Sequence, residues 1–177
     1  MAGMRLLKSF FITILGFFLV ITLVSLLMPS KVITTRTVSI NAKASDVMAQ
    51  IQNLNNWPNW HPLFSDPQFK IMQTSDGKVA TWSLNGETNK LHLISASHEQ
   101  AVFHLISSGE NTQENKISIL QFKDSSAVQV EWSALTHLKW YPWEKFSGIF
   151  VDKITGAGYE AALHELKTYL EITKKED

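Results

Sequence analysis

The chain has 177 residues, with 16 basic and 16 acidic side chains and no cysteine. That length favours one main domain, large enough to bury a core. The balanced charge argues against a nucleic-acid surface, which needs clustered Lys and Arg, and the absence of thiols excludes disulfides, thiolate catalysis and cysteine-type zinc sites.

Residues 9–28 form the first predicted element, an apolar run without a charged side chain. Twenty helical residues span roughly 30 Å, the thickness of a bilayer's hydrocarbon core. A cleaved signal peptide would have a shorter apolar region and a small-residue cleavage site, and a buried soluble helix would have a polar face. We therefore predict an uncleaved transmembrane anchor over residues 1–30 and assign Phe10, Phe18 and Leu26 to it.

The charges around this run bear on its orientation. Arg5 and Lys8 precede it and favour a cytoplasmic N-terminus, whereas Lys31 and Arg36 on the far side weaken the asymmetry. We expect the domain at residues 31–177 to lie on the extracytoplasmic side, as in a periplasm.

The first part of that domain predicts one strand and two short helices. Residues 32–40 are rich in β-branched side chains and predict a strand. A short helix should follow, capped by Ser45 or Asp46. Pro58 and Pro62 exclude one long helix in the next segment, so we expect a second short helix or turn whose aromatic side chains face inward.

An antiparallel meander of six strands is predicted over residues 68–138. Ser75-Asp76-Gly77 and Asn85-Gly86 mark two of its turns, and the polar residues 108–115 predict a loop. Alternation of side chains separates a buried face from a wet face that carries His92 and His104. The buried face is expected to contain Leu91, Leu93, Phe103, Leu105, Val130 and Trp132.

The last predicted element is a long helix that begins at Pro142, which suits a first helical position. Apolar residues recur at three- and four-residue spacing from Phe146 to Leu170 and form one stripe. Gly156-Ala157-Gly158 interrupts that stripe, which indicates a bend or a close approach to the sheet.

This order of elements resembles the helix-grip fold of the START/polyketide-cyclase superfamily, also called SRPBCC, which includes the birch-pollen-allergen-like proteins. Three stretches within residues 32–172 carry the resemblance. Residues 36–42 are similar to the opening strand, residues 54–62 (LNNWPNWHP) to the D-x-x-x-W-x-x-W-x-P segment of bacterial members, and residues 140–171 to the gripping helix. Asn55 or Asn56 stands where those proteins often carry Asp.

The resemblance implies an α+β fold in which a curved antiparallel sheet of about seven strands wraps around the long C-terminal helix, with two short helices after the first strand. One transmembrane helix would precede it. The superfamily uses a hydrophobic cavity between sheet and helix for lipids, sterols, polyketides and aromatic molecules. We expect the cavity to be lined by Trp57, Trp60, His61, Phe64, Leu91, Leu93, Phe103, Leu105, Val130, Trp132, Phe146 and Phe150.

Few residues suggest chemistry beyond binding. His61 could orient a ligand or act as a general base, but a packing and capping role is favoured because no partner acid is identifiable. Glu131 and Glu144 suit solvated structural roles. The six histidines have no metal-ligand spacing, and no phosphate loop, dinucleotide fingerprint or nucleophile elbow occurs. We expect no catalytic residue, metal or cofactor.

The leading hypothesis is membrane-anchored, non-catalytic binding of a hydrophobic small molecule or lipid. The alternatives are a polyketide cyclase- or dehydratase-like enzyme and an envelope interaction module with a filled core. The volume and polar lining of the cavity would separate the three. Trp140, Tyr141 and Trp143 could belong to the core or lie at a membrane interface.

Overall fold

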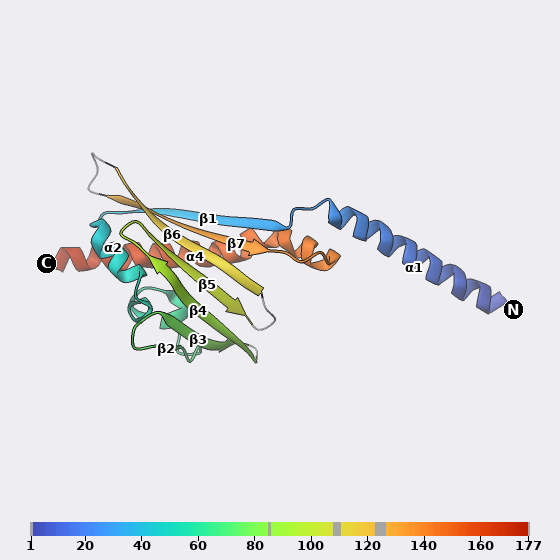
Figure 1. The fold of residues 1–177 in the computed structure, drawn as a ribbon, viewed down its shortest axis with the longest axis horizontal. Helices are drawn as coiled ribbons and strands as arrows, with labels where there is room; N and C mark the ends of the chain where they lie inside the picture. The colour runs from blue at the N-terminus through green and yellow to red at the C-terminus, as the bar shows by residue number, and fades with distance from the viewer. Residues whose placement is uncertain (1, 85, 108–110, 123–126, 177) are drawn as a thin grey trace.

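A computed structural model describes residues 2–84, 86–107, 111–122 and 127–176 (Figure 1). An apolar helix precedes one strand, three short helical segments, six further strands and a long final helix. In chain order the elements are α1 (Ala2–Leu26), β1 (Lys31–Ile40), α2 (Ala44–Ile51), the 3-10 helix η1 (Leu54–Asn59), α3 (Pro62–Ser65), β2 (Met72–Gln73), β3 (Val79–Leu84), β4 (Glu87–Ala96), β5 (Gln100–Ser107), β6 (Asn111–Gln121), β7 (Val128–His137) and α4 (Pro142–Glu176).

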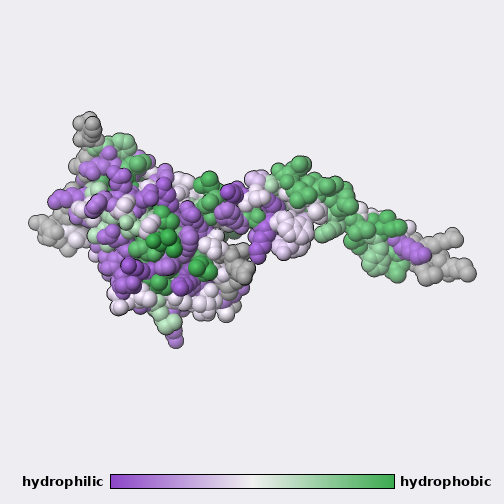
Figure 2. Space-filling model, in the orientation of Figure 1, coloured by the Kyte–Doolittle hydropathy of each residue, from purple (hydrophilic) through white to green (hydrophobic). Residues whose placement is uncertain are grey.

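Helix α1 projects from the rest of the molecule and is almost entirely exposed over residues 7–26 (Figures 1 and 2). It is long and apolar enough to cross a membrane. Phe10, Phe18 and Leu26 are all exposed on its surface. The hydroxyl of Thr22 donates to the carbonyl of Phe18 at 2.8 Å, so this polar group is satisfied within the helix.

The seven strands form one antiparallel sheet in the order β1-β7-β6-β5-β4-β3-β2. The predicted helix-grip fold is confirmed, because the sheet curves and α4 runs along its inner side (Figure 1). The predicted loop at 108–115 is wrong for residues 111–115, which pair with β5 and extend β6. Residues 108–110 lie outside the described residues.

Four elements cover the inner face of the sheet. Helix α2 buries Val47, Met48 and Ile51, while η1 and α3 bury Leu54, Trp57 and Phe64. The C-terminal half of α4 completes the cover. Its buried residues are Ala162, Leu163, Leu166 and Leu170.

Helix α4 continues without interruption through Gly156 and Gly158. The predicted close approach is real at Gly156, where an added Cβ would lie 2.1 Å from a guanidinium nitrogen of Arg36 on β1. That guanidinium pairs with Asp152, one turn earlier on α4, at 3.1 Å. The contact holds α4 against the edge of the sheet.

Candidate functional site

The Trp57 indole is the centre of an aromatic cluster between η1, α3 and the sheet. It is 1 % exposed, and its Nε1–H donates to the carbonyl of Ile51 at 2.9 Å. Its ring centroid lies between 5.0 and 5.9 Å from those of its aromatic neighbours, in tilted, stacked and edge-on arrangements that suit aromatic pairs. These neighbours are Trp60, His61, Phe64, Phe103 and Trp132.

Backbone contacts hold this cluster in place from two sides. The side chain of Asn53 accepts from the backbone N–H of Asn55 at 3.0 Å and caps η1. The N–H of Leu54 donates to the carbonyl of Gly77 at 2.8 Å. Gly77 has φ +66°, and a Cβ there would lie 1.9 Å from the Asn53 amide oxygen, so only glycine fits this contact. The β2–β3 turn therefore positions the aromatic segment.

His61 stacks on Trp57 with an interplanar angle of 12°. Its Nδ1 accepts from the N–H of Leu63 at 3.2 Å and caps α3. Burial lowers its pKa to about 3, so the imidazole is neutral near pH 7. No hydrogen bond among the described residues joins it to a carboxylate. This arrangement is that of a packing and capping residue.

Beyond the cluster, the inner face of the sheet becomes polar. We call this region the polar floor: Asn89, Ser107, Gln113, Asn115 and Thr136. The hydroxyl of Ser107 donates to Asn89 Oδ1 at 2.8 Å, and Gln113 Nε2 donates to Thr136 Oγ1 at 2.7 Å.

Two aromatic side chains connect to the polar floor. Tyr159 of α4 donates its hydroxyl to Gln113 Oε1 at 3.2 Å, and Trp132 Nε1 donates to Asn115 Oδ1 at 3.1 Å. Burial raises the pKa of Tyr159, which keeps this phenol protonated. The network thus joins the aromatic cluster, the sheet and α4.

A pocket of about 130 Å³ opens beside the polar floor, where the ends of β5, β6 and β7 meet the start of α4. Glu144 lies at its rim and accepts from the backbone N–H of Lys139 at 3.1 Å. A larger hollow of about 530 Å³ lies outside, between α2 and the C-terminal end of α4, and shares no residue with the aromatic cluster. The smaller pocket is lined by Leu105, Ser107, Thr112, Gln113, Thr136, His137 and Glu144.

Most of the residues expected to line a cavity are packed together instead. Leu93 and Leu105 are half-buried, and only Leu105 borders a described pocket. Of the others, all but His61, Phe146 and Phe150 are buried in the core with Trp57, which leaves the interior of the domain largely filled at that end. The buried ones are Trp57, Trp60, Phe64, Leu91, Phe103, Val130 and Trp132.

Phe146 and Phe150 were placed on the wrong face of α4. Their side chains are 37 % and 59 % exposed, so they do not line the interior. At about 100° per helical residue, Phe150 lies about 140° around the helix from the buried Leu163. The apolar stripe therefore belongs to two faces, which change over near Gly156.

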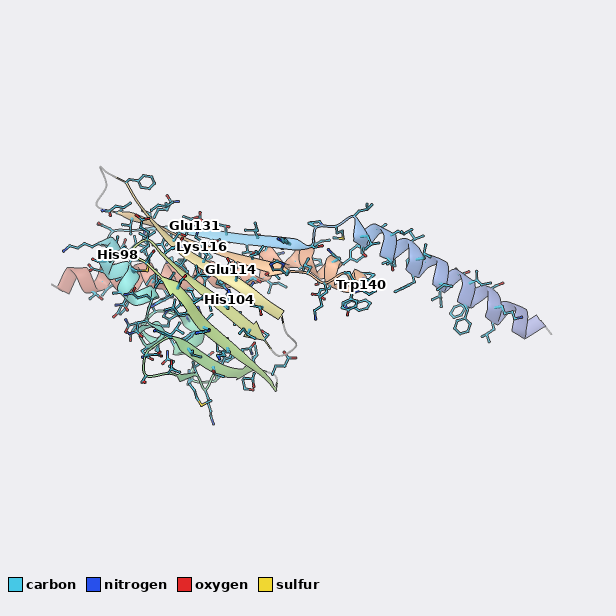
Figure 3. All side chains as sticks on the ribbon, viewed as in Figure 1. His98, His104, Glu114, Lys116, Glu131 and Trp140 are labelled. Carbon is cyan, nitrogen blue, oxygen red and sulfur yellow. The ribbon has the colours of Figure 1, made fainter. Side chains whose placement is uncertain are left out.

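His92 and His104 lie on the outer face of the sheet. His104 pairs across the strands with His92 on one side and Glu114 on the other. His104, Glu114, Lys116 and Glu131 are seen together on that face in Figure 3. No group of three metal-ligating side chains occurs among the residues that the structure describes.

We compared the sequence and the fold with those of known proteins. No model of a known protein family matches the chain, and no curated protein matches its sequence. A START superfamily protein from Mycobacterium smegmatis superposes with a TM-score of 0.59 at 18 % identity, over 80 % of this chain and 98 % of that one. The domain has a START-like fold.

Two further solved structures are similar to the START-like domain. A point mutant of norcoclaurine synthase from Thalictrum flavum, in complex with a transition-state analogue, has a TM-score of 0.62 at 15 % identity and covers 81 % of this chain and 96 % of that one. CalU16 from Micromonospora echinospora has a TM-score of 0.51 at 12 % identity and covers 78 % and 81 %. At these identities the likeness concerns the fold alone.

The polar floor of the START-like domain was missed in the sequence, although a signal for it exists. Asn89 lies two residues before Leu91, and Ser107 lies two residues after Leu105, so alternation places both on the inner face. The polarity of residues 108–115 indicated a loop, so Gln113 and Asn115 were not recognised as strand residues. Polar side chains at inward positions of a strand are therefore the feature that would have located this site.

Proposed function

We propose that the START-like domain binds a small hydrophobic molecule, or one end of a lipid, in the pocket beside the polar floor, without catalysis. Helix α1 would anchor the domain in the membrane that supplies such molecules. The observation that carries this proposal is the pocket itself, in which the apolar Leu105 meets the polar Ser107, Gln113 and Thr136. An apolar wall favours entry of an apolar group, and a few polar side chains orient it.

The pocket volume limits the ligand. Liquid water occupies about 30 Å³ per molecule, so about 130 Å³ holds a group equal in size to roughly four waters. A whole lipid would not fit, but a small ring or the end of a chain would. A larger ligand requires the first turns of α4 to move away from the sheet.

A cyclase- or dehydratase-like enzyme is the second candidate, and one observation favours it. Glu144 and His137 both border the pocket and could transfer protons to a bound molecule. Against this, Glu144 already accepts the backbone N–H of Lys139, and His61 is neutral and stacked in the core. Binding alone therefore fits the geometry better.

The test compares two variants of the full chain in detergent by native mass spectrometry. Thr136→Phe fills the pocket, whereas Leu135→Phe adds the same ring at the next position, which points to the outer face of β7. We expect the wild type and Leu135→Phe to retain a small co-purifying molecule and Thr136→Phe to lose it.

Two results would overturn the proposal. One is no bound molecule in any variant, together with no thermal shift from fatty acids, sterols or aromatic compounds. That result would favour an interaction module with a filled core. The other is a bound molecule that the wild type converts and Glu144→Gln does not, which would make the domain an enzyme.

A further inference from the structure

Exposed aromatic side chains gather where β7 leads into α4. We call Trp140, Tyr141 and Trp143 the collar. Trp140 and Trp143 are 60 % and 64 % exposed. Tyr141 stacks on Trp143 at a centroid distance of 4.9 Å and lies 4.9 Å from Trp140. Two neighbouring indoles left bare on one surface mark a contact site rather than ordinary surface variation.

The collar lies beside the end of α1. Lys145, two residues after Trp143, donates its Nζ to the carbonyl of Met28 at 3.3 Å and also contacts the hydroxyl of Ser30. The N–H of Leu138 donates to the carbonyl of Ser30 at 2.8 Å. Trp140 lies at the end of the domain nearest to α1 (Figure 3). The collar therefore sits at the level where the apolar surface of α1 ends.

We propose that the collar is a second membrane contact, which lies among the lipid headgroups of the same bilayer that α1 spans. The inference rests on the membrane anchor of the proposed function. Trp and Tyr favour this interface because each combines an apolar ring with a polar N–H or O–H. The exposed Lys31 and Lys139 add positive charge beside the collar, which suits lipid phosphates.

The geometry limits how far this contact extends. The headgroup layer is roughly 5–7 Å thick on each side of the bilayer. Helix α4 continues roughly along the direction of α1 (Figure 1). At about 1.5 Å per residue, Phe146 lies about 4.5 Å beyond Trp143, within that layer, whereas Ile154 lies about 16 Å beyond it. Only the collar and Phe146 belong to the proposed contact.

The collar has a consequence for the pocket. His137 and Glu144 border the pocket; His137 lies three residues before Trp140, and Glu144 directly follows Trp143. If the collar lies in the headgroups, the pocket opens next to the bilayer surface. An apolar molecule could then pass between membrane and pocket with little exposure to water.

The test reconstitutes the full chain in phosphatidylcholine vesicles and measures quenching of tryptophan fluorescence by brominated lipids. Bromines near the headgroup should quench more strongly than bromines near the chain ends. Four of the six tryptophans are buried, so the double variant Trp140→Phe/Trp143→Phe should lose most of the quenching. The control Trp82→Phe removes a buried indole and should keep it.

Alkaline carbonate extraction tests the membrane anchor separately from the collar contact. Equal quenching in the wild type and the double variant, in chain that resists extraction, overturns the collar contact while the anchor stands. Release of the chain by carbonate overturns the anchor and the collar together. Cross-linked dimers that the double variant abolishes, without quenching in the wild type, would make the collar a contact between two copies.

Discussion

At the scale of single residues, His61 is a titratable side chain packed among aromatic rings. Its ring lies within 6 Å of the rings of Trp57, Trp60, Phe64 and Trp132. These neighbours offer no negative charge to stabilise an imidazolium, so burial lowers its pKa from 6.5 to about 3. A buried neutral histidine links the stability of the fold to pH.

The sign of this linkage follows from the two pKa values. Between about pH 6.5 and 3 the unfolded chain binds a proton at His61 that the folded chain rejects, so the free energy of unfolding falls as the pH falls. Water reaches part of the ring, and we expect no more than about 2 kcal/mol between pH 6.5 and 4.5. Urea unfolding in detergent should show this slope, and His61→Gln should reduce it. An unchanged slope in His61→Gln would contradict the assignment.

Trp57 and Trp60 differ in whether the indole N–H has a hydrogen-bond acceptor, so the two residues can be compared directly. The indole N–H of Trp57 donates to Ile51, whereas the buried N–H of Trp60 has no acceptor among the described residues. Phe at position 57 leaves the Ile51 carbonyl unpaired, but Phe at position 60 removes an unpaired donor. We expect Trp57→Phe to destabilise the domain by about 1–2 kcal/mol more than Trp60→Phe in thermal unfolding. Equal losses would indicate that a water or ligand satisfies Trp60.

At the scale of elements, the two halves of the continuous helix α4 have different patterns of apolar residues. Its C-terminal half buries Leu163 and Leu166 against the sheet, while its N-terminal half exposes Phe150 and Ile154. Gly156 marks the change and lies directly beneath the guanidinium of Arg36. The pair of Arg36 and Asp152 raises the pKa of the first and lowers that of the second, chiefly through their hydrogen bond.

Gly156 and Gly158 of α4 predict opposite effects of the same substitution. A methyl group at Gly156 would meet the Arg36 guanidinium, so Gly156→Ala must displace that side chain and disturb its pairing with Asp152. Nothing lies within 4 Å of a Cβ at Gly158, and Ala favours a helix by up to about 1 kcal/mol over Gly. Thermal unfolding should show Gly158→Ala more stable than the wild type and Gly156→Ala less stable. A stabilising Gly156→Ala would contradict this expectation, because it would show that the Arg36 side chain can move without a loss of stability.

The sequence predicts the elements better than it predicts the site. Alternation correctly placed Leu91, Phe103 and Trp132 inward, because a sheet with one buried face repeats every two residues. The spacing of apolar residues gave the wrong positions for Phe146 and Phe150. A stripe at three- and four-residue spacing drifts around a 35-residue helix, and the spacing does not say which face of the helix meets the sheet. Alternation alone could have placed Asn89 and Ser107 of the polar floor inward, but the pairing that brings the side chains of β4–β7 together depends on strand registers, which local patterns do not determine.

At the scale of the whole molecule, α1 and the domain meet through few contacts. The chain turns between Leu26 and Lys31, and the Lys145 side chain, 3 % exposed, is the polar group that bridges this turn to α4. Ser25 of α1 is buried in the same junction. If α1 spans a membrane as proposed, Lys145 helps to set the direction in which the domain stands on it.

This role predicts that Lys145→Met loosens the junction without unfolding the domain. Methionine keeps the apolar stem but cannot donate to Met28 or Ser30. The chain has no cysteine, so a double variant can carry one spin label at Val24→Cys on α1 and one at Lys116→Cys on the outer face of β6. In vesicles, the distance distribution between the labels should broaden in Lys145→Met, while Lys145→Arg, which retains N–H donors, should keep it narrow. A distribution in Lys145→Met as narrow as in the wild type would contradict this role of Lys145.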